Sequence, residues 1–359
     1  MSQDPAGLKL APLTQWLGNA VSGFDASALV TADLLAGGRS NVSYKLTDAR
    51  GQQFVLRRPP LGNIMPTAHD MGREFRVLSG LNTVNFPAPL ALAHCEDDSV
   101  IGAHFMVMDF VDGQVVSDAK DAAALTFEQA ERISRSLVTT LAQLHTLDPA
   151  SAGLEKLGKP EGYLQRQAAR WIGQWELTKT RELPGIIDLH KWVESKLQHL
   201  PENLPTGIVH GDFRIDNVIL DRQNQNILAV LDWEMSTLGD PVSDLAISLV
   251  YWSQKNDTLR GNIPVAEHVT EGPGFWTREL FVSEYVNQTG FSIEHLDVCV
   301  ALACFKLAVI MESIHKRNLE GLQLGAASGA DSKMGIATQA LTELGLATIE
   351  LGAIAALNS

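Results

Sequence analysis

One polar stretch of the sequence, His210-Gly211-Asp212-Phe213-Arg214-Ile215-Asp216-Asn217, precedes two short apolar runs. The runs are Val218 to Leu220 and Ile227 to Leu231, and the polar segment 221–226 separates them. Apolar runs of this length on either side of a polar turn are typical of a β-hairpin. The sequence therefore predicts that the polar stretch is a loop leading directly into a hairpin.

Two residues with metal-binding oxygens stand at the open end of this predicted hairpin. Asn217 and Asp232 are equally far from its tip, so we expect them to face each other on neighbouring strands. An amide oxygen and a carboxylate suit Mg²⁺, which also keeps waters and substrate phosphates as ligands. Asp212 lies in the loop, five residues before Asn217. We interpret Asp212 as a proton acceptor next to a Mg²⁺ site.

The chain before residue 112 is rich in strand patterns. The predicted strands cover 34–36, 42–46, 53–57, 88–95 and 104–110, with a turn at 48–51 and a helix at 68–81. In the helix, Met71, Phe75 and Leu78 fall on one face. The first three strands and their turn indicate an antiparallel meander, and the helix and two more strands follow it.

From about residue 126 the apolar residues follow the period of a helix. Ile133, Leu137, Leu141 and Leu144 form one stripe within a helix predicted at 127–147. The rest of the chain is mostly helical, with the hairpin as the exception. The sequence thus indicates an α+β chain, with a strand-rich lobe at 1–112 and a helical lobe at 113–359.

The composition narrows the range of functions. The 359 residues include 42 acidic and 28 basic side chains, which gives a formal net charge of −14. This charge opposes binding to nucleic-acid backbones and anionic membranes, so we expect neither partner. Three cysteines without metal-site spacing fit a reducing cytoplasm, and we see no pattern of a signal peptide or membrane span. The oligomeric state stays open.

The two aspartates and the asparagine match the template of enzymes that transfer phosphoryl groups. His210-Gly211-Asp212 and Asp232-Trp233 resemble the motifs of the aminoglycoside phosphotransferase and choline kinase family, which has H-G-D in place of the kinase H-R-D loop. The resemblance covers roughly residues 30–345. It implies a two-lobed, protein-kinase-like fold that uses ATP or GTP together with Mg²⁺, held by Asn217 and Asp232.

The same resemblance assigns residues of the first lobe to the nucleotide. Arg57 occupies the position of the kinase lysine that contacts the α- and β-phosphates, with Glu74 as its partner. Arginine departs from the family pattern, but it is always charged and binds phosphate bidentately. A glycine-containing segment resembles the phosphate-binding loop, in which backbone N–H groups approach anionic oxygens. Its assigned residues are Gly37, Gly38, Ser40 and Asn41.

Three further residues receive roles from the resemblance. Met108 and Phe110 belong to the strand and hinge segment 106–111, which corresponds to the part of a kinase that meets the purine. Arg214 stands where protein kinases carry a lysine near the γ-phosphoryl group. It is therefore expected to offset charge that develops in the transition state.

Three phrases, at 54–60, 68–75 and 232–241, look most like the kinase-like domains attached to certain acyl-CoA dehydrogenases and their free-standing bacterial relatives. This likeness implies a hydroxyacyl acceptor, either as such or as its CoA thioester. We expect a kinase that moves the γ-phosphoryl group to a hydroxyl of a small molecule. Two alternatives stay open: an aminoglycoside or amino-alcohol kinase, and a non-catalytic nucleotide-binding protein of the same fold.

Overall fold

The chain folds as two compact units in a computed structural model that describes residues 4–35, 41–61, 70–201, 203–321 and 330–359. Unit 1 combines Met1–Gly113, Ala150–Leu154 and Leu228–Met235. Unit 2 combines Gln114–Pro149, Glu155–Ile227 and Ser236–Ser359. Each unit therefore joins segments that are distant in the sequence.

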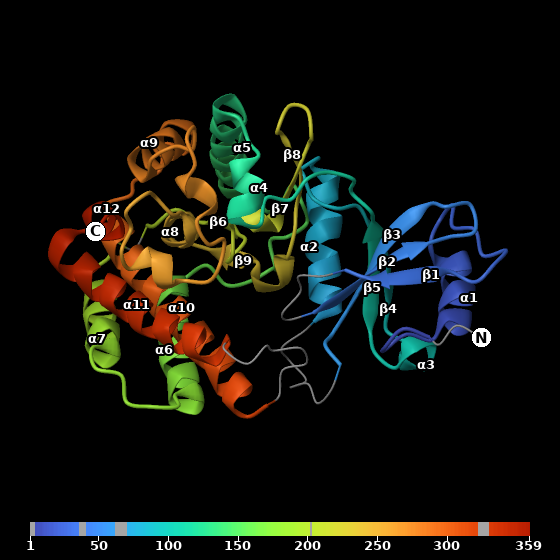
Figure 1. Cartoon of the computed structure of the whole chain (residues 1–359), viewed down its shortest axis with the longest axis horizontal. Helices are drawn as coiled ribbons and strands as arrows, with labels where there is room; N and C mark the ends of the chain where they lie inside the picture. The colour runs from blue at the N-terminus through green and yellow to red at the C-terminus, as the bar shows by residue number, and fades with distance from the viewer. Residues whose placement is uncertain (1–3, 36–40, 62–69, 202, 322–329) are drawn as a thin grey trace. The chain divides into compact units, whose positions relative to one another are not determined.

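Unit 1 is built on a five-stranded antiparallel sheet with the strand order β1-β2-β3-β5-β4 (Figure 1). The strands are β1 (Thr31–Leu34), β2 (Val42–Thr47), β3 (Gln53–Arg58), β4 (Ala91–Cys95) and β5 (Phe105–Asp109). The meander predicted for the first three strands is confirmed, although β1 begins ahead of the predicted 34–36. The turn after β2 is also confirmed, because the Asp48 carboxylate accepts the N–H groups of Arg50 (2.9 Å) and Gln52 (2.8 Å).

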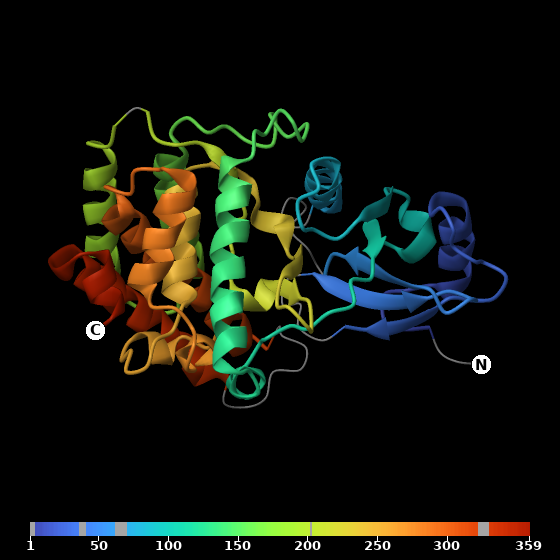
Figure 2. The same cartoon turned by 90° about the horizontal axis from the view of Figure 1, so that it is seen from above.

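Two helices cover the sheet of unit 1 on opposite sides, as Figures 1 and 2 both show. Helix α1 (Leu10–Ala20) buries Leu13 and Leu17 in a core that includes Phe54 and Leu56 of β3. Side chains alternate between the faces of a strand, so Arg57 points to the other face, where α2 lies. Helix α2 (Met71–Thr83) starts at the N-cap Asp70 and confirms the predicted helix, whose residues 68 and 69 are outside the described ranges. The short α3 (Asp98–Ile101) completes unit 1.

Unit 2 is mainly helical. Its helices are α4 (Ala119–Ala123), α5 (Phe127–Thr146), α6 (Tyr163–Thr178), α7 (Ile186–Leu197), α8 (Pro241–Tyr251), α9 (Arg278–Thr289), α10 (Leu296–Leu319), α11 (Ala330–Leu351) and α12 (Ala353–Leu357). Helix α5 begins with a capping box of Thr126 and Gln129, and its predicted apolar stripe is buried. The prediction of a helix at 127–147 is thus confirmed.

Helix α10 is the centre of unit 2. It contacts α6, α7, α8 and α11, which surround its label in Figure 1. Among the described helices, it is the one with the length and apolar composition to cross a membrane, yet 83% of its most apolar window is buried inside the protein. Burial on every side explains why its sequence lacks the polar face of a surface helix.

Short strands lie between α7 and α8 in the sequence. β6 (Gly207–Val209) pairs antiparallel with β9 (Thr237–Gly239), while β7 (Val218–Leu220) and β8 (Ile227–Val230) stand on either side of the predicted turn. The turn closes where Asp221 N–H donates to Asn226 O at 2.8 Å. One 3₁₀ turn, Ile215–Asn217, forms the end of the polar loop, and another, Trp233–Met235, comes after β8.

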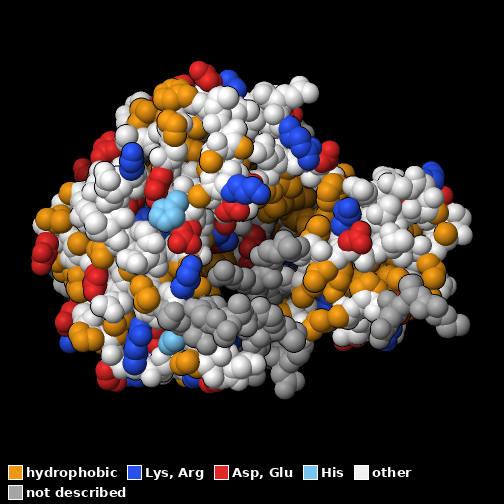
Figure 3. Space-filling model, viewed as in Figure 1, with side chains coloured by type: hydrophobic (Ala, Val, Ile, Leu, Met, Phe, Trp, Pro, Cys, Tyr) orange, Lys and Arg blue, Asp and Glu red, His pale blue; other side chains and the backbone are white. Residues whose placement is uncertain are grey.

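Charged side chains of both signs are interspersed among the described residues on the face seen in Figure 3. The acidic excess is larger near the end of the chain, where residues 233–359 contain 15 acidic and 7 basic side chains. Selection of a charged ligand therefore depends on which individual side chains line its site.

Replacing Leu13 by Ala tests whether α1 is an integral part of unit 1. Leu13 is fully buried, so the change should lower the free energy of unfolding by about 2–5 kcal/mol in a urea titration. Leu34→Ala is the control, because Leu34 is 65% exposed and its truncation should cost well under about 1 kcal/mol. Equal stability of the two variants would contradict the packing of α1 on the sheet.

Candidate active site

The loop that contains Asp212 is held by a buried carboxylate from another element of unit 2. Asp244, on α8, accepts the backbone N–H of His210 at 2.5 Å and that of Gly211 at 2.7 Å. Gly211 has φ +84°, a conformation that favours glycine. His210 braces the loop from within, since its Nδ1 accepts the N–H of Asp212 at 3.2 Å. The backbone that leads into Asp212 is thus fixed.

Asp244 stays ionised because of the groups around it. Burial alone would raise the pKa of Asp244, but the hydrogen bond from His145 and the N–H groups of the loop hold that pKa below its usual value. His145 Nε2 lies 3.3 Å from Asp244 Oδ2, and its Nδ1 lies 2.7 Å from the hydroxyl of Tyr285. Three helices therefore support the loop.

The Asp212 carboxylate is oriented by three donors. Tyr251 OH donates to Oδ1 at 2.9 Å, while Arg214 Nε and Asn217 Nδ2 donate to Oδ2 at 3.0 Å and 3.1 Å. A carboxylate has about four lone-pair positions, so one more hydrogen bond completes the set. Tyr251 is a site residue that the sequence analysis missed, because nothing in the sequence connects α8 to this loop.

The Asn217 amide presents its oxygen for a ligand. Its Nδ2 donates to the backbone O of Asp212 at 2.9 Å and to the Asp212 carboxylate, and these two acceptors fix which end of the amide is the nitrogen. The oxygen Oδ1 is then the remaining polar atom. A hard carbonyl oxygen fits Mg²⁺, so the donor set agrees with the predicted metal role of Asn217.

Arg214 is engaged with the acidic residues of its own loop. Its guanidinium pairs with Asp212 and Asp216 and lies 5.4 Å from the ring centroid of Tyr251. Burial alone would lower the pKa of Arg214, but the two carboxylates raise it. Arg214 therefore orients Asp212 directly, and its predicted contact with the γ-phosphoryl group stays a prediction.

Unit 1 contains a second charged cluster around Arg57. Its Nε lies 3.1 Å from Glu74 Oε2, and its Nη2 lies 2.5 Å from Asp232 Oδ1 and 3.8 Å from Glu234 Oε2. The pairing of Arg57 with Glu74 is thus present, while contact with nucleotide phosphates stays a prediction. Burial alone would lower the pKa of Arg57, but the three carboxylates raise it. Glu234 was missed, although it stands two residues after Asp232.

Asp232 adopts φ +67°, which is unusual for a residue other than glycine. Aspartate tolerates this conformation better than most residues, and the Arg57 guanidinium holds its carboxylate in place. Whether Asp232 and Asn217 share one Mg²⁺ stays a prediction.

Among the assigned phosphate-loop residues, Gly37, Gly38 and Ser40 are outside the described ranges, whereas Asn41 Nδ2 donates to Glu234 Oε2 at 2.9 Å.

The two residues assigned to the purine lie at the end of β5. Met108 is buried and pairs with Val55 and Ala91 in the sheet. Phe110 follows the strand, with Lys45 Nζ 5.9 Å from its ring centroid. Their contact with a base stays a prediction.

Lys306, on α10, is a buried cation that the sequence analysis did not assign to the site. Its Nζ donates to the backbone O of Gly211 at 2.6 Å. Burial lowers the pKa of Lys306 to about 8 and Arg170 acts in the same direction, whereas the carboxylates of Asp212 and Asp244 oppose the shift. The signal was its position as the one charged residue in the apolar run 298–311.

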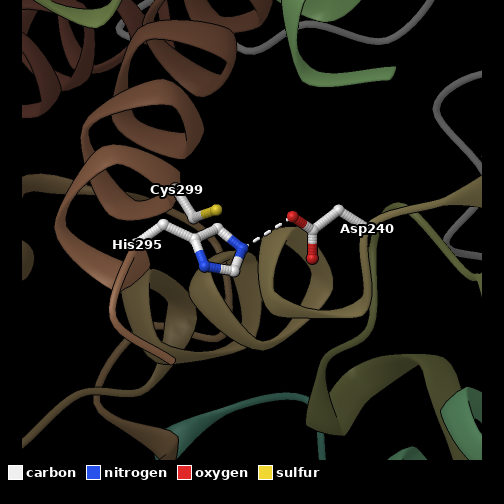
Figure 4. Close-up of side chains that lie close together, drawn as sticks. All are labelled: Asp240, His295 and Cys299. Atoms are coloured by element: carbon white, nitrogen blue, oxygen red, sulfur yellow. Dashed lines mark hydrogen bonds and ion pairs between the residues drawn. The ribbon is translucent and has the colours of Figure 1, made fainter. Parts of the chain in front are cut away.

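A further buried cluster joins α8 to α10 in Figure 4. Side-chain atoms of Asp240, His295 and Cys299 lie within 4.8 Å of one another. His295 Nε2 and Asp240 Oδ2 are 2.6 Å apart. Two atoms bound tetrahedrally to one Zn²⁺ at bond lengths of about 2.0–2.1 Å would lie farther from each other, so this pair forms a hydrogen bond. Asp240 Oδ1 also caps α8 by accepting Val242 N–H at 2.9 Å. This cluster anchors the start of α8.

Comparison with known proteins identifies the family of this chain. Residues 31–275 match the phosphotransferase enzyme family (APH). The chain belongs to this family. Among solved structures, one from Ralstonia eutropha JMP134, described as a candidate aminoglycoside phosphotransferase, is 31% identical with a TM-score of 0.76 and covers 94% of this chain and 97% of its own. The protein-kinase-like fold expected from the sequence is confirmed.

Two further relatives differ in what they share with this chain. Acyl-CoA dehydrogenase family member 11 of Rattus norvegicus is 35% identical over 329 residues, which are 90% of this chain and 41% of that protein. The chain thus spans about two fifths of this relative's length. A thermostable mutant of the phosphotransferase APH(4)-Ia, in a ternary complex with AMP-PNP and hygromycin B, is 14% identical with a TM-score of 0.56, over 92% of this chain and 98% of its own. That likeness concerns the fold.

Replacing Glu74 by Gln tests the charge balance around Arg57 in the nucleotide-free protein. Burial, with Asp232 nearby, raises the pKa of Glu74 to about 7 from an ordinary 4.5, although Arg57 and the backbone N–H of Trp233 oppose this. The folded state then binds more protons between these values than the unfolded state, so this contribution to stability falls as pH rises. Glutamine cannot ionise, and the variant should lose this dependence.

The measurement is the free energy of unfolding of both proteins at pH 5 and pH 8. From pH 5 to pH 8, the unmodified protein should lose more stability than Glu74→Gln. Glu182→Gln serves as the control, because the Glu182 side chain is 93% exposed and its substitution should leave the pH dependence unchanged. A difference between Glu74→Gln and the unmodified protein that is constant with pH would show that Glu74 is ionised throughout.

Proposed function

We propose that this family member is a kinase that transfers the γ-phosphoryl group of ATP or GTP to a hydroxyl of a small molecule. The observation that carries the proposal is the Asp212 carboxylate, which Tyr251, Arg214 and Asn217 orient. Counted over the described residues, one acceptor position remains for a hydroxyl. Positioning of this kind supplies most of the catalysis in phosphoryl transfer.

In the proposed reaction, the acceptor hydroxyl donates its hydrogen bond to Asp212. A bond forms between the acceptor oxygen and the γ-phosphorus while the bond from the γ-phosphorus to the bridging oxygen breaks. The electron pair of that broken bond leaves with the nucleoside diphosphate, and the hydroxyl proton passes to Asp212. The products are a phosphate monoester and the nucleoside diphosphate.

The nucleotide is assigned to the cluster around Arg57. Asn217 Oδ1 and the Asp232 carboxylate would hold Mg²⁺, which supplies positive charge to the β- and γ-phosphate oxygens. Arg57 now neutralises Asp232, and in the proposed complex it binds the α- and β-phosphates instead. We assign nucleotide binding to residues 1–112 and the acceptor and catalytic loop to residues 113–359.

We further propose a hydroxyacyl compound, or its CoA thioester, as the acceptor. The support is the likeness over most of this chain to proteins named for acyl-CoA dehydrogenases. A cytoplasmic location is also proposed, since the three cysteines are all buried as free thiols.

Replacing Asp212 by Ala should lower kcat about 10²- to 10⁴-fold, because the hydroxyl loses its proton acceptor. Binding of the Mg²⁺–nucleotide complex should change little, as measured by calorimetry. Phosphoryl transfer is followed through nucleotide consumption in the presence of hydroxy acids, hydroxyacyl-CoA thioesters, amino alcohols and aminoglycosides. Asp188→Ala, at an exposed position on α7, is the control and should keep full activity. Unchanged kcat in Asp212→Ala would remove Asp212 from the mechanism.

Replacing Asp232 by Ala should raise the Mg²⁺ concentration for half-maximal activity and weaken nucleotide binding, because a carboxylate ligand is lost. Asn217→Ala should raise the Mg²⁺ requirement as well, by a smaller factor, since a neutral oxygen is lost. Both effects are read from Mg²⁺ titrations at fixed nucleotide concentration. If neither variant alters the titration, the proposed Mg²⁺ ligands are wrong.

A further inference from the structure

A hollow lies between α6, α8 and α10 in unit 2, and we call it the α10 pocket. One face of α10 forms its wall, because Cys299, Leu302, Ala303 and Lys306 recur at helical spacing. Trp171 of α6 and Ile247 of α8 line the other sides. The pocket is therefore largely apolar, with Lys306 as its cation.

Three polar side chains of the α10 pocket already form hydrogen bonds within the protein. Tyr163 bonds to the side chain of Ser243, and the Ser243 hydroxyl donates to Asp240 O at 2.6 Å. Gln167 Oε1 accepts Trp171 Nε1–H at 3.1 Å. These bonds hold the three side chains against the pocket wall, and Lys306 is the charged group of its lining.

The Lys306 ammonium group can donate further hydrogen bonds. An ammonium group has three donors, and among the described residues Nζ donates one hydrogen bond, to Gly211 O at 2.6 Å. The side chain is 7% exposed, and Nζ lies 5.8 Å from the ring centroid of Trp171. A buried ammonium gains strongly from an oxygen acceptor, because burial has removed its water.

Lys306 connects the α10 pocket to the loop that contains Asp212. Gly211, which accepts its hydrogen bond, immediately precedes Asp212. A ligand whose oxygen binds Nζ is thus held next to the loop that carries the proton acceptor. A bound ammonium group, as in amino alcohols or aminoglycosides, would be repelled by Lys306 at the same place.

We propose that the α10 pocket binds the acyl group of the phosphate acceptor, with the carboxylate or thioester carbonyl oxygen on Lys306 Nζ and the aliphatic chain against Trp171, Ile247 and Leu302. This inference rests on the proposed kinase function and adds the residue that selects the acceptor. The phosphoryl transfer is the one already written, with the hydroxyl of the acyl chain as the attacking group. Lys306 binds the substrate and takes no proton in the reaction.

The test compares acceptors that differ only in the oxygen group at the end of the chain. Hydroxyoctanoates with the hydroxyl at carbon 2, 3, 4 or 5, their CoA thioesters and the corresponding octanediols are assayed with the full chain and Mg²⁺–ATP. The value of kcat/KM for the best acid or thioester should exceed that for its diol about 10- to 100-fold, the usual effect of one hydrogen bond to a charged group. The acid and thioester arms show which carbonyl source is preferred.

Lys306→Met should abolish this preference, so the ratio of kcat/KM between acyl compound and diol falls about 10- to 100-fold. Lys316→Met, on the same helix, is the matched control and should keep the ratio, since Lys316 Nζ binds Leu177 O. A role limited to bracing Gly211 would slow every acceptor by one common factor. An unchanged ratio in a folded Lys306→Met protein overturns the inference.

The unmodified protein provides a second test that needs no variant. A ratio near one, or a preference for ethanolamine over the hydroxyoctanoates, overturns the role of Lys306 while leaving the kinase proposal intact. Absence of phosphoryl transfer to all of these acceptors, with nucleotide still bound, overturns this inference. Absence of transfer to aminoglycosides and amino alcohols as well overturns the kinase proposal itself.

Discussion

The carboxylate of Asp244 is the interaction on which the catalytic loop depends. It is fully buried, and it accepts two consecutive backbone N–H groups, those of His210 and Gly211. Without it, these two N–H groups would lose their carboxylate acceptor, and a buried donor left unsatisfied costs about 1–3 kcal/mol. Because the glycine at 211 is held at positive φ, the next residue, Asp212, can point its carboxylate towards Tyr251. A single buried charge thus sets the direction of the proposed proton acceptor.

Charge compensation is the common feature of the two clusters. In unit 1 one guanidinium, Arg57, serves three carboxylates, and in unit 2 Arg214 serves two. Such groups are costly to bury singly, and pairing each with an opposite charge offsets part of that cost. Phosphates and a divalent cation would exchange partners within these clusters. In that exchange, charges that are already desolvated meet a ligand without first losing much water.

Local patterns made most of the secondary structure and the Asp212 loop predictable. The stripe of α5 and the turn at Asp48 depend on residues close in sequence, and family resemblance placed Glu74 beside Arg57. The contacts that escaped prediction connect distant positions. Tyr251 reaches Asp212 across 39 residues, and Lys306 reaches Gly211 across 95. Helix α1 was missed because Pro12 and Gly18 weaken its local signal, while burial of its leucines stabilises it.

The three thiols have a practical consequence as reporters. All are buried, Cys95 in unit 1 and Cys299 and Cys304 in unit 2. Burial raises the pKa of each thiol, so in the folded protein they are both shielded and short of the reactive thiolate form. An alkylating reagent can therefore modify them only when the surrounding structure opens. The rate of labelling at each cysteine would reveal how often each unit opens by itself, without any engineered probe.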